Sequence, residues 1–206
     1  MYVERNGFCV PRALLGAGLL IGLLACLVGQ AQARTYQPSK CSYANVAKTF
    51  SPWGDNNYYE LAPDGGFEGG GAGWTLSGGA TLVQANEDHF LNGPQDHTAV
   101  LLPYGASATS PPICVDETTP SFRVMTRNIG EKGAKLHVTI SYVVSGGTKI
   151  QQTDAPPADK GWAASPPLQL QTDGEAERVA RITFTSSERK AEYLVDDLYV
   201  DPFARH

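Results

Sequence analysis

The chain is poor in positive charge. No lysine or arginine occurs between Lys48 and Arg123, and the whole sequence carries 16 Lys and Arg against 21 Asp and Glu, a net charge of −5. Surfaces that bind nucleic acids or anionic lipids need clustered cations. The sequence therefore argues against a nucleic-acid partner and against an anionic membrane surface as a partner.

The first 33 residues have the parts of a secretory signal peptide. Arg5 and Arg12 give a basic start, residues 13–29 are almost entirely apolar, and small residues stand at −3 and −1 of a cleavage site before Arg34. The alternative is a retained membrane anchor, since the apolar run has about the length of a short spanning helix. No basic cluster follows it to stop transfer, so we expect cleavage, secretion and no membrane contact afterwards.

Cysteine is also scarce. Only Cys41 and Cys114 lie beyond the signal segment, and an even pair in an exported protein predicts a disulfide. Such a bond would close a loop of about 70 residues and contribute on the order of 4 kcal/mol. It would fasten an N-terminal arm, residues 34–57, to the domain formed by residues 58–206.

Helical periodicity is missing after the signal segment, and short β-rich runs take its place. In residues 134–144 apolar residues alternate with polar ones, which predicts a half-buried strand, and Ser-Gly-Gly at 145–147 predicts a hairpin turn. About nine such runs, separated by Gly, Pro, Asp and Ser, predict an all-β antiparallel β-sandwich. Residues 154–168 form the longest irregular stretch, which we expect to be a surface loop.

Motifs of the common enzyme classes are absent as well. The sequence has no phosphate loop, no G-x-S-x-G elbow and no H-E-x-x-H, and none of its four histidines stands at a zinc-binding spacing. Glu87 and Asp88 are acids of the type that glycosidases use, but adjacent residues usually point apart. We therefore expect a protein that is not an enzyme.

Glycine, in contrast, is concentrated in "PDGGFEGGGAGWTLSGGA", residues 63–80. No lysine or arginine is near, so this stretch is no phosphate cradle. Large apolar residues recur in it, which a flexible linker would not carry. We expect a first strand, a tight turn and a second strand, with glycines in positive-φ conformations and Trp74 in the core.

The same stretch resembles the opening of galactose-binding-like jelly rolls, notably carbohydrate-binding modules of families 4, 9 and 22. Those modules begin with N-G-x-F-E and G-W and end on a strand with two adjacent aspartates, as "LVDDLYVDP" does at residues 194–202. Together with "SPWGD" and "SATSPPICV", these motifs are also similar to a group of bacterial secreted proteins of unknown function. The resemblance implies a jelly roll and an exported protein.

The resemblance further implies a structural calcium ion. In those modules the glutamate of F-E and an aspartate of D-D lie side by side on neighbouring terminal strands. Carried over, the ligands are Glu68 and Asp196, with Asp197 as an alternative, and with Gly66 and Asp96 as helpers. The residues agree, because alternation places Asp196 on an apolar face, where an unpaired carboxylate is costly, and calcium takes oxygen ligands.

Two functions remain open for such a module. One is carbohydrate binding, for example of a cell-wall polysaccharide, through exposed aromatic rings. The other is a structural or protein-interaction role in the cell envelope without a sugar site. Trp162 is the first choice for a ring that binds sugar, although its position favours packing over the sandwich edge slightly more. The other aromatic candidates are Trp53, Tyr58, Tyr59, Phe90 and Tyr104.

Overall fold

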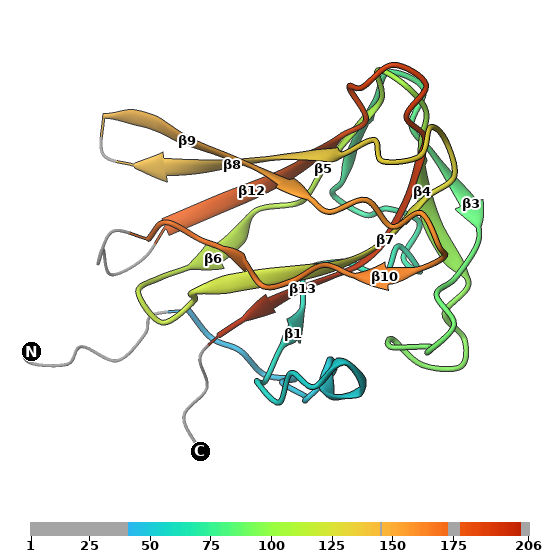
Figure 1. Ribbon diagram of the computed structural model, residues 1–206. Helices are drawn as coiled ribbons and strands as arrows, with labels where there is room; N and C mark the ends of the chain where they lie inside the picture. Colours follow the sequence, from blue (N-terminus) through green and yellow to red (C-terminus); the bar gives the residue numbers. More distant parts are fainter. Residues whose placement is uncertain (1–40, 145, 173–177, 203–206) are drawn as a thin grey trace, which may run out of the picture. The chain divides into compact units, whose positions relative to one another are not determined.

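The computed structural model describes residues 41–202, apart from residue 145 and residues 173–177 (Figure 1). The chain divides into two units, Met1–Tyr36 and Gln37–His206, and every described residue belongs to the second. The architecture below is that of the second unit.

Two features of the sequence fall outside the described residues. These are the predicted signal peptide, residues 1–33, and the terminal His206. Within the described ranges no helix has the length and apolar character needed to cross a membrane.

Strands make up nearly all regular structure in the described residues, where the single helical element is a 3-10 turn, η1 (Ser51–Trp53). Most strands are short, because Gly, Pro and Asp interrupt the β-rich runs. The strands are β1 (Glu60–Leu61), β2 (Thr75–Ser77), β3 (Thr81–Gln84), β4 (Thr98–Leu102), β5 (Ser107–Thr109), β6 (Ile113–Val115), β7 (Ser121–Asn128), β8 (Leu136–Val144), β9 (Gly147–Ala155), β10 (Ala163–Ala164), β11 (Leu168–Gln169), β12 (Arg178–Thr185) and β13 (Tyr193–Asp201).

The strands form two sheets that face each other (Figure 1). One has seven strands in the order β10-β7-β13-β4-β3, with β1 paired to β13 and β11 paired to β7. The other has six strands in the order β2-β5-β12-β8-β9, with β6 paired to β12. Neighbouring strands pair antiparallel, for example β8 with β9. The predicted antiparallel β-sandwich is confirmed, with more and shorter strands than expected.

The core between the sheets follows from the alternation of side chains along each strand. On β8, Leu136, Val138 and Ile140 are buried in the core, whereas His137 and Thr139 are partly exposed. A fully buried side chain of this size contributes roughly 1.5–3 kcal/mol. The alternation predicted for residues 134–144 and the hairpin after them are confirmed.

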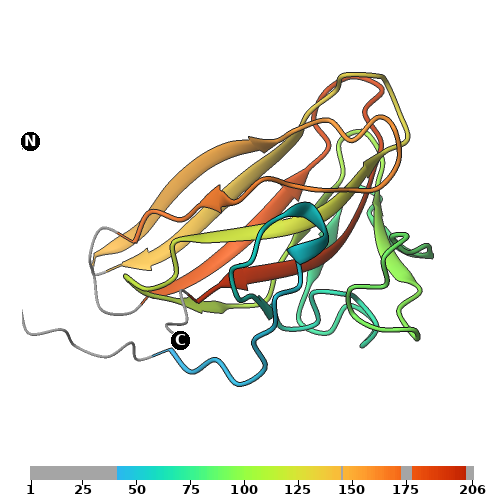
Figure 2. The same ribbon diagram turned by 60° about the horizontal axis from the view of Figure 1, so that its bottom comes forward.

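β7 is buried on both faces, which its sequence does not reveal. Phe122 belongs to the core between the sheets, whereas Met125 packs in a second apolar cluster with Phe50 and Tyr59. These last two residues belong to a segment that we call the N-terminal strap, residues 41–59. Figure 2 shows the strap crossing the outer face of the seven-stranded sheet.

The strap is tied down by covalent and polar bonds. The predicted disulfide is confirmed, since Cys41 and Cys114 are bonded with their Cα atoms 5.7 Å apart. Arg123, on the outer face of β7, lies 2.9 Å from the Asp55 carboxylate of the strap. The guanidinium also lies over the Phe50 ring, 4.3 Å from its centroid. The strap is therefore an integral layer over that sheet.

The glycine-rich stretch differs from its prediction. Residues 63–73 form consecutive turns, so the expectation of a first strand within them is wrong, and β2 begins only after Trp74. The Asp64 carboxylate accepts hydrogen bonds from the Gly69 and Ala72 amides at 2.7 and 2.5 Å, which replaces strand pairing. Trp74 is buried in the core, as predicted.

The stretch at residues 154–168 is also more ordered than a surface loop. Ala163 and Ala164 form β10, which pairs with β7. Ser165 is buried, and its carbonyl oxygen accepts a hydrogen bond from Arg123 Nε at 2.7 Å. The prolines around β10 limit it to two residues at the edge of the sheet.

Candidate functional site

The first candidate site lies where the last strand is irregular. β13 carries a bulge between Asp196 and Tyr199, and Asp197 has a φ of 51°. An extra residue in a strand exchanges its two faces beyond that point. Tyr193 and Val195 therefore face the core before the bulge, and Leu198 and Val200 face it afterwards. Alternation placed Asp196 on the apolar face of the strand, and this expectation is wrong because the bulge puts Leu198 and Val200, but not Asp196, on the core face.

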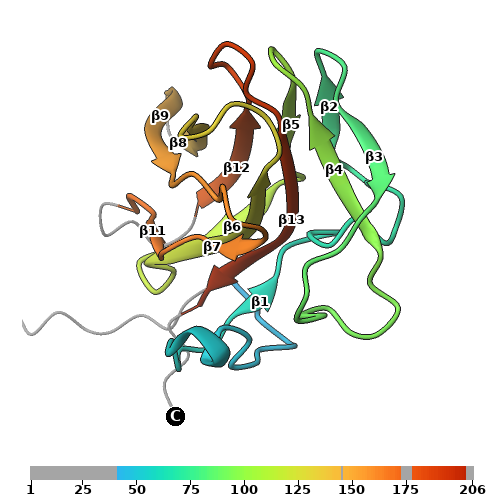
Figure 3. The same cartoon turned by 45° about the vertical axis from the view of Figure 1, so that its right-hand side comes forward.

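The bulge brings Asp197 against two acids from another part of the chain. Oxygen atoms of Glu87, Asp96 and Asp197 all lie within 4.8 Å of one another. We call these three residues the acidic cluster. Glu87 and Asp96 come from the β3–β4 connection, residues 85–97, which Figure 3 shows between the ends of β3 and β4.

The acidic cluster is short of compensating groups. Asp96 and Asp197 are 3% and 0% exposed, and none of their four carboxyl oxygens has a hydrogen-bond partner among the described residues. Beside them, Asp196 is also fully buried; one oxygen accepts the Asp197 amide at 2.8 Å and the other has no partner. Buried carboxylates in this state are costly unless a proton or a cation joins them.

Burial and mutual repulsion act on the acidity of these groups. Burial, then the adjacent Glu68 carboxyl and the charge of Glu87, raise the pKa of Asp96 to about 7, against a smaller lowering by the Asn92 backbone. Burial also raises the pKa of Asp197, with the charges of Asp96 and Glu87 adding to it. The pKa of Asp196 is raised by burial and by the charge of Asp197. A divalent cation would remove the repulsion, and oxygen-only donors suit calcium.

Glu68 lies beside the acidic cluster but has partners of its own. Its carboxylate accepts the His97 amide at 2.8 Å and lies 2.6 Å from His97 Nδ1. Burial raises its pKa, but hydrogen bonds from the backbone of His97 and from Thr98 lower it further, so that the net shift is downward. The residues that feel its charge are Asp96 and Asp197.

Gly66 lies close to the acidic cluster. A Cβ at Gly66 would lie 3.3 Å from Asp197 Oδ1 and 2.5 Å from the side-chain nitrogen Nδ2 of Asn92. The preceding turn is bonded to β13, because the Leu198 amide donates to the Gly65 carbonyl at 3.1 Å. A side chain at Gly66 would therefore separate the glycine turn from the β3–β4 connection.

Sequence reasoning missed Glu87 as a member of this site. It is 1% exposed, and its two oxygens accept the amides of His89 and Leu91, both at 2.5 Å. The length of the β3–β4 connection was the available signal, since a hairpin loop usually has two to five residues. A long loop with an acid near each end, Glu87 and Asp96, indicates a place where the loop is held to the rest of the domain.

The second candidate site is a groove of about 490 Å³ on the outer face of the six-stranded sheet. We call it the β8–β9 groove. Its side chains stand in cross-strand rows, because His137 pairs with both Asp154 and Thr185, and Thr139 pairs with Gln152. Its outward-facing polar side chains are those of His137, Thr139, Gln152, Asp154, Thr185 and Ser187.

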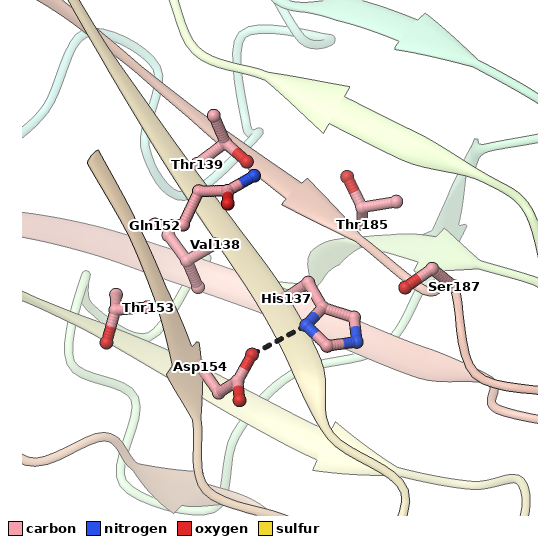
Figure 4. Close-up of a pocket in the computed structure, with 8 residues that line it drawn as sticks. All are labelled: His137, Val138, Thr139, Gln152, Thr153, Asp154, Thr185 and Ser187. Carbon is pink, nitrogen blue, oxygen red and sulfur yellow. Dashed lines mark hydrogen bonds and ion pairs between the residues drawn. The ribbon is translucent and has the colours of Figure 1, made fainter. Parts of the chain in front are cut away.

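Polar groups meet within this groove. Figure 4 shows His137 and Asp154 pointing toward each other, with 2.6 Å between Nδ1 and Oδ1. Lys135 Nζ lies 3.4 Å from the other oxygen of Asp154. Glu188 lies on the far side of the imidazole, 3.9 Å from Nε2. The groove thus offers imidazole, carboxylate, amide and hydroxyl groups on one open face.

Tyr104 belongs to the β4–β5 connection, which is hydrogen-bonded to a segment that borders the β8–β9 groove. It precedes Gly105, whose amide donates to the Ser186 carbonyl at 2.7 Å, and Ser187 lines the groove. The Tyr104 side chain is 59% exposed. Of the aromatic residues considered from the sequence, Tyr104 is the one whose backbone neighbours border this groove.

The remaining aromatic candidates lie elsewhere. Phe90 is 53% exposed in the β3–β4 connection, at the other end of β4 from Tyr104. Trp162 is half-buried and packs against the apolar cluster of Phe50, as Trp53 of the strap does. Tyr59 belongs to that cluster and is fully buried, so its consideration as a sugar platform is wrong.

The architecture defines the class of protein as an antiparallel β-sandwich of the jelly-roll type, the class predicted from the sequence. No protein-family model matches the chain, and no curated relative matches it. Solved structures similar to it include carbohydrate-binding modules of families 61, 22, 11 and 16.

Three of the similar solved structures illustrate how distant the similarity is. A family 61 module in complex with β-1,4-galactotriose is 19% identical, with a TM-score of 0.42, over 68% of this chain and 96% of that one. A family 11 module from Clostridium thermocellum, in complex with a mixed-linked tetrasaccharide, is 11% identical, with a TM-score of 0.45, over 72% and 98%. An arabinose-bound α-L-arabinofuranosidase is 15% identical, with a TM-score of 0.49, over 71% and 27%. At these values the likeness assigns no ligand.

Proposed function

We propose that this chain is an exported, non-catalytic module that binds carbohydrate in the β8–β9 groove. The observation that carries the proposal is the rows of polar side chains in the groove, together with an exposed aromatic residue, Tyr104, whose neighbour Gly105 is bonded to Ser186 beside the groove. Sugar hydroxyls need several convergent donors and acceptors, and the C–H face of a sugar packs well on an aromatic ring. The disulfide and the signal-like N-terminal segment support export.

Retention on immobilised polysaccharides tests this function. We expect wild-type protein to be retained on at least one wall or plant polysaccharide among xylan, mixed-linked glucan, galactan, chitin and peptidoglycan. Tyr104→Ala should weaken retention roughly fivefold or more, because a stacked ring contributes about 1 kcal/mol or more. Gln152→Ala should also weaken it, through the loss of hydrogen bonds.

Phe90→Ala is the matched control. Phe90 and Tyr104 have similar exposure, but Phe90 lies away from the groove, so its substitution should leave retention unchanged. If folded wild-type protein is retained on none of these polysaccharides, carbohydrate binding is wrong. If Phe90→Ala weakens retention and Tyr104→Ala does not, the groove is not the site.

A protein-interaction role in the envelope is the second candidate. It is favoured by three exposed aliphatic side chains on the same sheet face, Val143, Ile150 and Val179, of which Val143 and Val179 are cross-strand partners. Val143→Lys should then abolish co-sedimentation with an envelope fraction. If it instead weakens polysaccharide retention alone, these residues belong to the carbohydrate site.

A structural calcium ion near Glu68, Gly66, Asp96 and Asp196 remains part of the proposal. The support is the excess of buried carboxyl oxygens without donors. An ion that binds only the folded state stabilises it by about 2.7 kcal/mol at a concentration of 100 times its Kd. The thermal midpoint should therefore rise with calcium and fall with a chelator. An unchanged midpoint would contradict the proposal of a structural calcium ion.

A further inference from the structure

The buried acids of the β3–β4 connection have no role in carbohydrate binding at the β8–β9 groove. The connection places two acids, Glu87 and Asp96, against a third, Asp197, in the interior of the protein. Asp96 and Asp197 contribute four oxygens without donors. A packed protein does not keep such a group without compensation, because each unpaired buried carboxylate opposes folding.

Glu87 has a different role from the two aspartates. Its oxygens accept the amides of His89 and Leu91, which curls the middle of the connection around this carboxylate. A carboxylate oxygen has two acceptor directions, so each oxygen retains capacity for one further partner. Glu87 therefore holds the loop and at the same time faces Asp96 and Asp197.

We infer that a divalent cation of the calcium type is held by Glu87, Asp96 and Asp197, and that it clamps the β3–β4 connection onto the bulge of β13. The inference rests on the calcium proposal but changes its ligands. Glu68 stands outside the set, because the oxygens that all lie within 4.8 Å of one another belong to Glu87, Asp96 and Asp197. Asp196 supports the bulge through its bond to the Asp197 amide.

The clamp reaches the N-terminal strap. His89 packs edge-on against Trp53 with ring centroids 4.5 Å apart. Leu91 packs against the apolar cluster of Phe50, and its carbonyl accepts the Tyr199 hydroxyl at 3.5 Å. A cation that fixes the β3–β4 connection thus also fixes one side of the strap. Without it, repulsion among the acids pushes the connection away from both.

Calcium titration of the full mature chain tests the ligand set. Calorimetry should give a Kd that rises by roughly tenfold or more in Glu87→Gln, Asp96→Asn and Asp197→Asn, the range seen when a metal site loses a carboxylate or its support. Asn tolerates positive φ, so Asp197→Asn keeps the bulge geometry. Glu68→Gln should change the Kd by no more than about twofold on this scale.

Two further readouts concern the clamp. Calcium should slow hydrogen exchange in residues 85–97 and change Trp53 fluorescence in wild-type protein, and Asp96→Asn should abolish both effects. Chelator-treated Asp96→Asn and Asp197→Asn should melt at or above the midpoint of chelator-treated wild type, because one uncompensated charge is gone. This comparison shows that a loss of calcium binding is not a loss of folding.

The outcomes separate the inference from the proposals on which it rests. If wild-type protein binds calcium and Glu68→Gln abolishes binding while Asp96→Asn does not, the ligand set inferred here is wrong and the calcium ion stands. If wild-type protein binds no calcium, the inferred ligand set and the calcium proposal are both wrong. Polysaccharide retention by the β8–β9 groove is measured separately, since the groove is built on the other sheet.

Discussion

At the scale of single residues, Arg123 shows how a charge is accommodated under the strap. Its side chain is 6% exposed and lies between the Asp55 carboxylate, the Ser165 carbonyl and the Phe50 ring. Asp55 also accepts the Tyr59 hydroxyl at 2.7 Å. Breaking such a pair by removing one partner costs more than the pair contributes, because the other charge stays buried.

We therefore predict that Asp55→Asn lowers the free energy of unfolding by roughly 1–3 kcal/mol. Urea unfolding at neutral pH measures this change. Glu117→Gln, at an exposed acid, is the control and should change stability by less than about 0.5 kcal/mol. Equal effects of the two substitutions would show that Asp55 and Arg123 are not coupled.

The same pair predicts a pH dependence. Burial raises the pKa of Asp55, but hydrogen bonds from Tyr59, the Asn57 amide and Arg123, together with the Arg123 charge, lower it below its usual value. A group with a depressed folded-state pKa stabilises above its unfolded pKa, about 3.9, and loses that contribution as pH falls through the folded value. The difference between wild type and Asp55→Asn should shrink below about pH 4.

At the scale of elements, the β2–β3 turn contains two glycines that differ in one respect. Gly78 and Gly79 both have positive φ, 65° and 92°. A Cβ at Gly78 would overlap the carbonyl oxygen of Gly105 on the neighbouring β4–β5 connection, whereas a Cβ at Gly79 would meet nothing within 4 Å. The pair therefore separates backbone strain from steric overlap.

We predict that Gly78→Ala destabilises the protein by about 1–3 kcal/mol more than Gly79→Ala. Both substitutions carry the cost of a side chain at positive φ, roughly 1 kcal/mol, and only the first also pushes the β4–β5 connection away. Thermal unfolding of both variants measures the difference. Equal losses of stability in the two variants would mean that the β4–β5 connection moves away from the Gly78 side chain at no cost.

Whether a feature of an element could be predicted from the sequence depends on whether it is local to that element. Alternation in residues 134–144 gave the strand, its hairpin and its buried face, because the period of a strand is local. The bulge at Asp197 is not local: it depends on pairing with β7, so alternation assigned Asp196 to the wrong face. Glu87 was missed because its partners, Asp96 and Asp197, meet it only in the folded chain.

At the scale of the whole molecule, the strap turns a two-sheet sandwich into a structure with an additional layer. No run of residues predicted this layer, since Phe50 and Tyr59 lie in an irregular segment and find Met125 and Tyr199 only after folding. The predicted β-sandwich was recoverable from periodicity, whereas the cover on its outer face was not. The long-range contact predicted from the residues without the resemblance was the disulfide, because expected export and an even number of cysteines require no geometry.

The disulfide fixes the end of the strap across a separation of 73 residues. A crosslink of that span removes unfolded-state entropy worth about 4 kcal/mol in the loop-closure model. We predict that the Cys41→Ser/Cys114→Ser double variant loses about this much free energy of unfolding. The folded state should keep its near-ultraviolet spectrum, because Phe50, Tyr59 and the Asp55–Arg123 pair still hold the strap.

Urea unfolding with and without a reductant checks this prediction and contains its own control. Wild-type protein in reductant should match the double variant, and the double variant should not respond to the reductant. If the free energy is unchanged, the bond does not restrict the unfolded chain. If instead the near-ultraviolet signal collapses while the sheets persist, the bond holds the strap in place and the packing of Phe50 and Tyr59 alone does not. The two results differ because the crosslink acts on the unfolded chain, whereas packing acts on the folded one.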